Sequence, residues 1–226
     1  MTQDEAKLLA AQRAVAFVQD GMAVGLGTGT TATLFIRELG KRVAAEKLRI
    51  RCIATSDASD KLARSLGIPI TTFAETPVLD LNVDGADEVG PSLALIKGGG
   101  GAHLREKIVA SCATEFVVVA DSTKLVPFLG RFPLPVEVFL FALPLVTRRL
   151  DALGLNPVLR HHPDGSLYLT DEHNVILDCH CGTIPEPART AAEIRAIIGV
   201  VEHGLFLNMA TVALIAGEDG VTEHRP

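Results

Sequence analysis

The chain has 226 residues, of which 48% are hydrophobic and 21% charged, and its formal net charge is -6. This length suffices for one large domain carrying a smaller second one, and the composition excludes disordered, fibrous and coiled-coil proteins. Lysine and arginine are not concentrated in any stretch and tryptophan is absent, which argues against nucleic-acid binding. A phosphate ester remains a possible ligand, because backbone amides and one or two lysines outweigh a diffuse negative charge.

The first half of the chain alternates short apolar runs with helical patterns. Residues 4–19 place apolar side chains at helical spacing before Gly21, which predicts an amphipathic helix. The expected strands lie at 22–26, 49–54, 68–73, 78–83, 93–97 and 115–121, and the expected helices at about 30–45, 58–66 and 102–113. This alternation is typical of an α/β protein with a mainly parallel sheet wrapped by helices on both faces.

The pattern changes from about Pro133. The expected strands there are 132–139, 156–160, 167–170 and 174–180, with helices near 142–153 and 187–198. This favours a smaller α+β unit inserted into the main domain, and the apolar segment 205–220 is expected to return to the first sheet. The sequence therefore predicts a main domain of residues 1–131 and 205–226, and a second domain of residues 132–204.

Targeting and redox features point to a cytoplasmic protein. Residues 1–20 lack a basic segment followed by an apolar one, and the apolar stretch 132–146 is interrupted by prolines and too short to span a bilayer. The four cysteines match no common disulfide spacing, so free thiols are expected. We expect no membrane partner.

The run AVGLGTGTTA at 23–32 joins a strand to a helix through a glycine-rich turn. Gly27 and Gly29 allow the backbone to pass close to a ligand, while the first amides of the helix face it. Thr28, Thr30 and Thr31 add hydroxyl groups. The turn is therefore interpreted as an anion-binding site.

Two other interpretations of this turn stay open. A dinucleotide fingerprint requires a third glycine where Thr30 stands, so NAD is not favoured. A tight turn that needs glycine only for its geometry is the structural alternative. In the similar segment ATSDAS at 54–59, Ser56 and Ser59 are candidates for helix capping or ligand contact.

Acidic residues follow the strand at 78–83 in the sequence DGADE. Asp84, Asp87 and Glu88 lie at the carboxyl end of that strand, the edge at which open α/β sheets bind ligands. Three acids within five residues raise the possibility of a metal. The next segment supplies Lys97 instead of further metal ligands, so no metal is expected.

The sequence KGGGG at 97–101 places four glycines after a lysine and before a helix. Exposed amides, the ammonium group of Lys97 and the positive end of a helix together suit a developing oxyanion. Glu106 follows within the first turns of that helix. A carboxylate base beside such a pocket fits proton abstraction next to a carbonyl, without a redox cofactor, although Glu106 taken alone could be a solvated helix residue.

Six segments, in this order and spacing, resemble ribose-5-phosphate isomerase of the A type over nearly the whole chain: GLGTGTTA, TSDAS, VDGADE, KGGGGAHLREKIVA, VADSTK and FPLPVEV. The resemblance implies interconversion of D-ribose 5-phosphate and D-ribulose 5-phosphate through an enediolate, with no metal or nucleotide cofactor. It also implies a Rossmann-like main domain, a ferredoxin-like second domain that makes oligomer contacts, and a homodimer or homotetramer. A non-catalytic sugar-phosphate-binding regulator on the same scaffold is the main alternative, and an amino-sugar-phosphate deaminase or acyl-CoA transferase is another.

The resemblance also implies the roles of single residues. Glu106 matches the base that moves a proton between C1 and C2, and Asp84 matches the acid linked to ring opening. Asp87 and Lys97 match a supporting charged pair. The implied substrate contacts, besides Asp84, Asp87 and Lys97, are Thr28, Gly29, Thr30, Thr31, Gly85, Ala86, Gly98, Gly99, Gly100 and Lys124.

Two histidine-containing features are interpreted as structural. His103 precedes Glu106 by three residues, and packing is favoured over a second acid–base role, although it could tune the pKa of Glu106. In DCHC at 178–181, Cys179 and Cys181 would share one face of a strand while His180 points to the other. Strand packing is therefore favoured over zinc.

Overall fold

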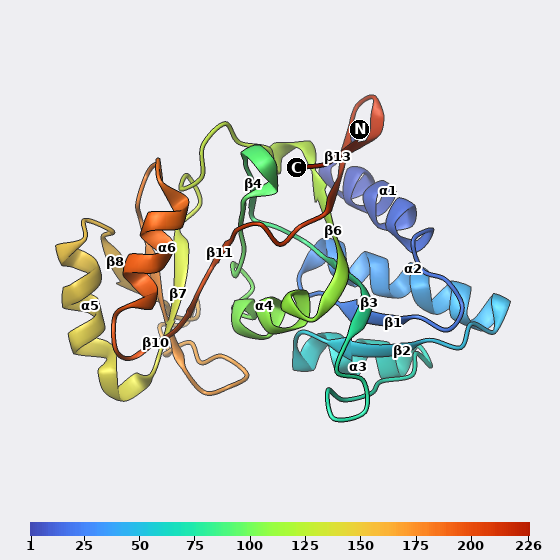
Figure 1. The fold of residues 1–226 in the computed structure, drawn as a ribbon, viewed down its shortest axis with the longest axis horizontal. Helices are drawn as coiled ribbons and strands as arrows, with labels where there is room; N and C mark the ends of the chain where they lie inside the picture. The colour runs from blue at the N-terminus through green and yellow to red at the C-terminus, as the bar shows by residue number, and fades with distance from the viewer.

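The computed structural model describes residues 1–226, which form three β-sheets with helices around them (Figure 1). The largest sheet has six strands in the order β13-β12-β6-β3-β1-β2, in which only β13 is antiparallel to its neighbour. Its strands are β1 (Ala23–Leu26), β2 (Arg51–Ala54), β3 (Leu79–Asp84), β6 (Ala113–Asp121), β12 (Val212–Gly217) and β13 (Gly220–His224). The chain runs from β1 outward to β2 and then crosses to β3 on the other side of β1. The direction in which successive strands are added to the sheet therefore reverses between β1 and β3.

Helices cover both faces of this sheet. Its helices are α1 (Gln3–Val15), α2 (Thr30–Glu46), α3 (Asp57–Ser65) and α4 (His103–Ser111). Alternate strand residues such as Val24 and Leu81 pack with α1 and α2, whereas Ala23 and Leu79 pack on the opposite side with Val109 of α4. Helix α3 packs against the edge strand β2 and against α2. The expected α/β fold with helices on both faces is therefore confirmed.

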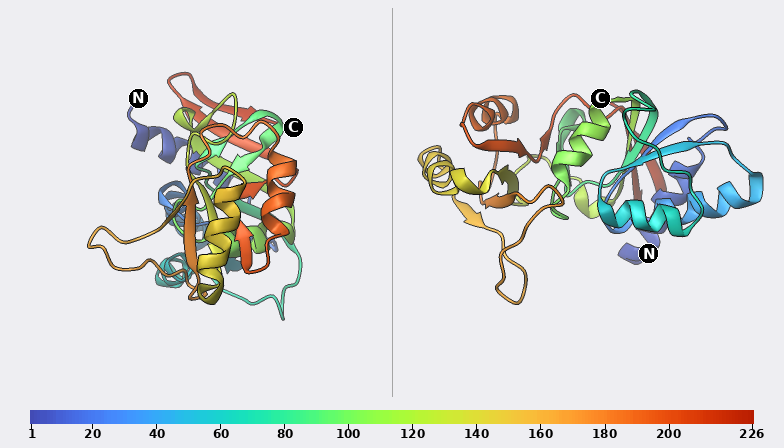
Figure 2. Two further views of the ribbon diagram at one scale, coloured as in Figure 1. Left: turned by 90° about the vertical axis from the view of Figure 1, so that its left-hand side faces the viewer. Right: turned by 90° about the horizontal axis from the view of Figure 1, so that it is seen from below.

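The second unit is a four-stranded antiparallel sheet in the order β10-β7-β9-β8 with two helices. Its elements are β7 (Leu134–Val138), α5 (Leu143–Ala152), β8 (Pro157–Leu159), β9 (Val175–Cys179), α6 (Pro187–Arg195) and β10 (Val200–His203). The β-α-β-β-α-β succession is that of a ferredoxin-like fold, as expected. This unit has a separate apolar core. It lies beside the main sheet in Figure 1 and in the right-hand view of Figure 2.

A short three-stranded sheet connects the two units. It consists of β4 (Glu88–Val89), β5 (Leu95–Ile96) and β11 (Leu205–Phe206) in the order β11-β5-β4. The remaining short helices are η1 (Pro91–Leu93), η2 (Ser122–Lys124) and η3 (Leu140–Ala142). Because β5 ends one residue before Lys97, this sheet fixes where the KGGGG segment begins.

Several expected elements differ from the structure. The segment 68–73 forms only an isolated bridge between Ile70 and Cys52, since Pro69 has no N–H to give a ladder. The segment 167–170 has a single bridge, from Leu167 to His161. The expected strand 93–97 is reduced to β5 and lies outside the parallel sheet. The first helix ends at Val15 rather than at residue 19, and strands β10 and β13 were not predicted.

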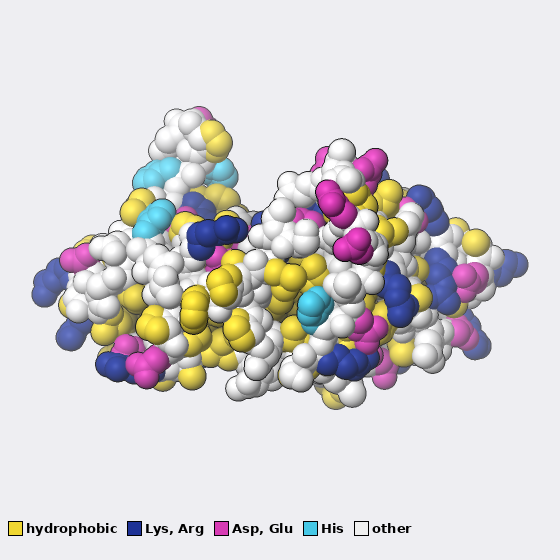
Figure 3. Space-filling model, turned by 90° about the horizontal axis from the view of Figure 1, so that it is seen from above, with side chains coloured by type: hydrophobic (Ala, Val, Ile, Leu, Met, Phe, Trp, Pro, Cys, Tyr) yellow, Lys and Arg dark blue, Asp and Glu magenta, His cyan; other side chains and the backbone are white.

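Figure 3 shows how charged and hydrophobic side chains are distributed on the face seen from above. Charged side chains are spread over both ends of the molecule and hydrophobic side chains gather between them, so this face carries no continuous basic stripe (Figure 3). None of the helices combines the length and apolar character needed to pass through a membrane.

Candidate active site

A cavity opens where the main sheet changes direction, at the carboxyl ends of β1 and β3. In open α/β sheets this crevice is the usual ligand site. The residues that line it are Lys7, Thr28, Gly29, Thr30, Thr31, Gly85, Ala86, Asp87, Lys97, Gly98, Gly100, Glu106 and Lys124. The structure thus brings together segments that are up to about a hundred residues apart in the sequence.

The predicted site residues gather at this cavity with two exceptions. Asp84 is fully buried and lies beneath the lining, and Gly99 is not part of it. Lys7 of α1 lines the cavity and was missed, because a lysine in an amphipathic helix carries no sign of a ligand site in the sequence. Only the packing of α1 beside α2 and β6 brings it there.

The turn after β1 is built for close approach. A side chain at Gly27 would collide with Asp84, whose Oδ1 would lie 2.2 Å from its Cβ. Gly29 has a φ of 102° and begins α2 without a side-chain cap, and the first turn of the helix carries no acid. The amides of Gly29, Thr30 and Thr31 have no hydrogen-bond partner in the protein. This open helix N-terminus is suited to an anion.

The hydroxyl cluster after β2 supports that turn. Ser56 accepts a hydrogen bond from the amide of Ser59 and so caps α3, and Ser59 Oγ donates to the carbonyl of Gly27 at 2.7 Å. Thr28 Oγ1 lies 2.7 Å from Thr55 Oγ1 and 2.8 Å from Ser56 Oγ. Capping was the expected role of at least one of these serines, and the structure confirms it for Ser56.

Three buried charged groups form the centre of the site. Lys97 Nζ lies 3.1 Å from Asp84 Oδ2 and 3.4 Å from Glu106 Oε2, and it donates to the carbonyl of Gly85 at 2.5 Å. Asp84, Lys97 and Glu106 are only 0%, 2% and 4% exposed. Asp84 Oδ1 accepts the amides of Thr28 at 3.0 Å and Gly85 at 2.7 Å. One ammonium group is therefore shared by two carboxyl groups out of contact with bulk water.

Burial and mutual repulsion change the protonation of these groups. Burial, together with the nearby Asp84 and Asp87, raises the pKa of Glu106 to about 8 against the opposing effect of Lys97. Burial also raises the pKa of Asp84, against the opposing effect of Lys97. The pKa of Lys97 is lowered by burial, but the adjacent carboxylates outweigh that effect and hold it above its ordinary value. Glu106 is thus a carboxyl group that can exchange a proton near neutral pH.

The glycine loop at residues 98–101 forms the wall opposite the turn after β1. Asp87 Oδ2 accepts the amide of Gly99 at 2.7 Å, so Asp87 holds this loop. The amides of Gly98 and Gly100 have no partner in the protein. Two amide donors beside the Lys97 ammonium are suited to an oxyanion.

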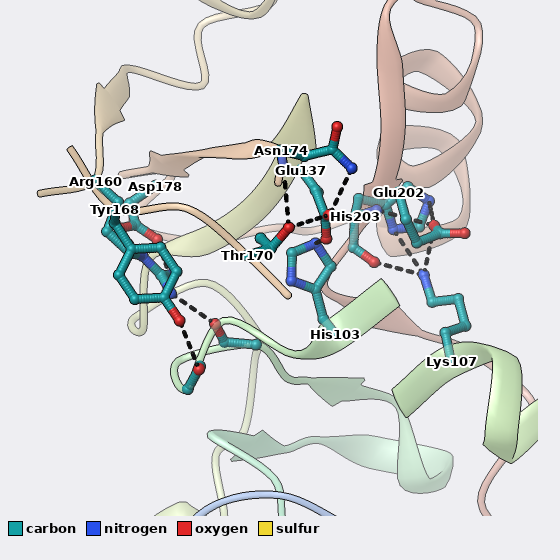
Figure 4. Close-up of polar contacts among 12 residues, drawn as sticks. His103, Lys107, Glu137, Arg160, Tyr168, Thr170, Asn174, Asp178, Glu202 and His203 are labelled. Atoms are coloured by element: carbon teal, nitrogen blue, oxygen red, sulfur yellow. Dashed lines mark hydrogen bonds and ion pairs between the residues drawn. The ribbon is translucent and has the colours of Figure 1, made fainter. Parts of the chain in front are cut away.

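His103 does not line the cavity, and it packs beneath Gly98 and against the second unit (Figure 4). It is fully buried, its Nε2 lies 3.9 Å from Glu137 Oε2, and burial lowers its pKa to about 3. His103 is therefore neutral at physiological pH, in agreement with the packing interpretation. The four cysteines are unpaired, and no cluster of three or more histidine, cysteine, aspartate or glutamate side chains is arranged to hold a metal.

The comparisons with known proteins agree with one another. Residues 51–220 match the family model of ribose 5-phosphate isomerase A (phosphoriboisomerase A). The chain is 56% identical to ribose-5-phosphate isomerase A of Roseiflexus castenholzii, over 95% of this chain and 92% of the relative, and 50% identical to that of a Synechococcus species, over 98% and 97%. Among solved structures it is similar to ribose 5-phosphate isomerase A from Methanocaldococcus jannaschii, with a TM-score of 0.96, 42% identity and full coverage of both chains.

Proposed function

The chain belongs to the ribose 5-phosphate isomerase A family and interconverts ribose 5-phosphate and ribulose 5-phosphate, and we propose that it does so in the cavity at the carboxyl ends of β1 and β3. It is thus an aldose–ketose isomerase of the pentose phosphate pathway, and a non-catalytic regulator is not favoured. The observation that carries the assignment of the site is the buried cluster of Lys97, Asp84 and Glu106 beside unpaired backbone amides. A similar structure has been solved in complex with phospho-erythronic acid, an acyclic sugar-phosphate acid, at 34% identity and a TM-score of 0.97 over both full chains.

Glu106 is proposed as the base that removes the proton from C2 of the open-chain aldose and returns it to C1. Its raised pKa makes the ionised form a stronger base than an ordinary glutamate, and it keeps both protonation states accessible near neutral pH for the return step. The Lys97 ammonium and the amides of Gly98 and Gly100 would stabilise the enediolate oxygen that develops between these steps. No redox change occurs beyond the exchange of hydrogen between two carbons.

Asp84 is proposed to handle the hydroxyl protons, both during ring opening and in the transfer from O2 to O1 that completes the isomerisation. Its Oδ1 is occupied by two backbone amides, whereas its Oδ2 receives no backbone hydrogen bond and faces Lys97 Nζ. Burial raises its pKa, so a proton on Oδ2 is less costly than on an exposed aspartate. Because Asp84 lies beneath the cavity lining, Lys97 is the group through which it would reach the substrate. Asp87 is proposed to hold the glycine loop in place.

The phosphate is proposed to bind at the N-terminus of α2, where the amides of Gly29, Thr30 and Thr31 are unpaired. Lys7 and Lys124 line the same cavity and supply positive charge. Replacing Lys124 with methionine is expected to raise KM for ribose 5-phosphate about 10- to 100-fold with little change in kcat, because a charged hydrogen bond to a non-reacting group contributes uniform binding. Steady-state kinetics measure this.

The matched control for Lys124 is Lys41→Met, which removes an exposed lysine paired only with Glu38. Its KM should equal that of the parent protein. An unchanged KM in the Lys124 variant would remove Lys124 from the phosphate site, whereas a large fall in kcat at constant KM would give it a role in the chemical step.

Turnover should depend on pH through Glu106. Between about pH 6.5 and the pKa of about 8, kcat/KM is expected to rise roughly 15-fold in total, because only ionised Glu106 can accept the C2 proton. The substrate phosphate ionises lower, with a pKa of about 6, and is mostly dianionic throughout this window. Initial rates of ribulose 5-phosphate formation at constant ionic strength test the prediction. A flat profile down to pH 6.5 would contradict a base with this raised pKa.

We also propose that residues 132–204 form a domain that makes oligomer contacts, and that the protein acts in the cytoplasm as a homodimer or homotetramer. Phe139, Leu140, Phe141 and Ile198 of this unit are exposed, and Phe141 and Ile198 are 89% and 88% exposed. Large exposed apolar patches usually mark interaction surfaces.

The cytoplasm is where phosphorylated sugars of central metabolism are processed. The four cysteines are free thiols, which agrees with a reducing compartment.

Sedimentation can test the oligomer. The variant Phe141→Asp is expected to lower the mass of the particle to that of a single chain, because a buried unpaired carboxylate is costly at an apolar contact. The control Val78→Asp changes an exposed apolar residue of the main unit, 64% exposed, and should leave the mass unchanged. A parent protein that already sediments as a monomer would contradict the proposal.

A further inference from the structure

An arm of the second unit, residues 160–174, reaches from β8 across to the glycine loop before the chain enters β9. The tip of this arm projects from the molecule, whereas its two ends lie against the main unit (Figure 2). Arg160 and Tyr168 of the arm point at the loop from the side of the second unit (Figure 4). Neither residue lines the cavity, so any effect on the reaction must pass through the loop.

The two side chains hold three successive carbonyl groups of the glycine loop. Arg160 Nη1 donates to the carbonyl of Gly98 at 3.0 Å and to that of Gly99 at 3.2 Å. Tyr168 Oη donates to the carbonyl of Gly100 at 3.1 Å. The fit is close, because a Cβ at Gly101 would lie 2.1 Å from Tyr168 Oη. Loop and arm are thus matched to each other over four glycines.

Hydrogen bonds within the second unit hold both ends of the arm in place. Asp178 of β9 accepts hydrogen bonds from Arg160 Nε at 2.8 Å and from Arg160 Nη2, so the guanidinium plane is fixed. At the other end of the arm, Glu137 accepts hydrogen bonds from Thr170 and Asn174, each at 2.9 Å. The two ends of the arm are therefore held in place by side-chain hydrogen bonds.

The orientation of one peptide group connects the arm to the chemistry. In a trans peptide the C=O and the following N–H point in opposite directions. Fixing the carbonyl of Gly99 with Arg160 therefore fixes the amide of Gly100 on the opposite side, and Gly100 lines the cavity with an amide that has no partner in the protein. A charged donor on the carbonyl also polarises the peptide group and strengthens its N–H as a donor.

We propose that Arg160 and Tyr168 are positioning residues for the isomerisation. Arg160 aims and polarises the Gly100 amide toward the enediolate oxygen, and Tyr168 holds the next peptide group, between Gly100 and Gly101, so that the loop keeps this orientation. The inference rests on the proposed role of the glycine loop as the oxyanion site. It gives the second unit a part in the chemistry of the first, in addition to any oligomer contact.

Kinetic variants test this proposal. Arg160→Met is expected to lower kcat about 10- to 100-fold while KM for ribose 5-phosphate changes less than about threefold, because the amide remains but is less well aimed at the developing charge. Tyr168→Phe keeps the ring and removes one hydrogen bond, and it should lower kcat about 3- to 10-fold. The control Arg189→Gln removes an arginine of α6 that pairs only with Glu186 and Glu193, and its kcat should match the parent.

A double variant separates positioning from stability. Arg160→Met leaves the Asp178 carboxylate unpaired, which can lower the melting temperature by itself. Arg160→Met with Asp178→Asn removes that charge, so the melting temperature should recover while kcat stays low. Parental kcat in both Arg160→Met and Tyr168→Phe, or recovery of kcat together with melting temperature in the double variant, would overturn the proposal. Glu106→Gln, assayed in parallel, distinguishes failure of this proposal from failure of the proposed active site. An active Glu106→Gln would overturn the proposed site itself.

Discussion

Glu106→Gln is expected to lower kcat about 10²- to 10⁴-fold, the range that a general base contributes. Glutamine has nearly the same shape as glutamate but cannot accept the C2 proton. KM should change little, because the phosphate is proposed to bind at the N-terminus of α2 and not at Glu106. Steady-state kinetics at pH 8 measure both constants. The control Glu46→Gln alters an exposed carboxylate paired with Arg42 and should retain parental activity.

The same variant makes a prediction about stability. Because burial raises the pKa of Glu106 from 4.5 to about 8, the folded protein holds a proton that the unfolded chain has released between these two pH values. The contribution of this group to stability therefore falls as the pH rises through that window. Glutamine does not ionise, so it loses no stability as the pH rises, and Glu106→Gln should melt no lower than the parent at pH 8. An inactive variant that also melts far lower would point to a structural role instead.

Lys97→Met is expected to lower kcat about 10²- to 10³-fold, since it removes the charge next to the enediolate oxygen. It also leaves the carboxyl groups of Asp84 and Glu106 buried without their shared cation, which should destabilise the fold by about 3–5 kcal/mol. Kinetics normalised to the folded fraction from circular dichroism separate the two effects.

The pH profile provides an independent test of Lys97. Because Lys97 lowers the pKa of Glu106, its removal should move the rise of kcat/KM to higher pH. The control Lys61→Met changes a lysine of α3 outside the cavity and should keep the parental profile. Parental kcat and an unshifted profile in Lys97→Met would contradict the assignment of Lys97 to the reacting centre.

The order of most elements follows from local patterns in the sequence, whereas the roles of single site residues were implied by the family resemblance. The alternation of apolar runs and helices gave the parallel sheet, and glycines that no propensity explains marked the turn after β1 and the loop at 98–101. In both glycine-rich segments the structure shows a steric reason for a glycine. Gly27 lies against Asp84, and Gly101 lies against Tyr168.

The errors arose where long-range packing decides the outcome. Residues 167–170 have the composition of a strand, yet they form part of the arm, because Tyr168 is used to reach Gly100. Strand β10 was missed since it reads VVEH, in which Glu202 and His203 are buried polar residues that pair with Lys107 of α4 (Figure 4). Lys7 reaches the cavity, and Arg160 reaches the glycine loop, only through the packing of their units, which no local pattern reveals.

Deuterium uptake in heavy water tests most directly the claim that Glu106 moves a proton between C1 and C2. EDTA-treated parent protein should convert ribose 5-phosphate to ribulose 5-phosphate without added metal, because the Lys97 ammonium already occupies the place between the two carboxyl groups that a cation would take. NMR should show deuterium accumulating at C2 of the remaining ribose 5-phosphate, and Glu106→Gln should show neither conversion nor uptake above background. Loss of turnover in the metal-free parent, or uptake by Glu106→Gln at the parental rate, would contradict this account.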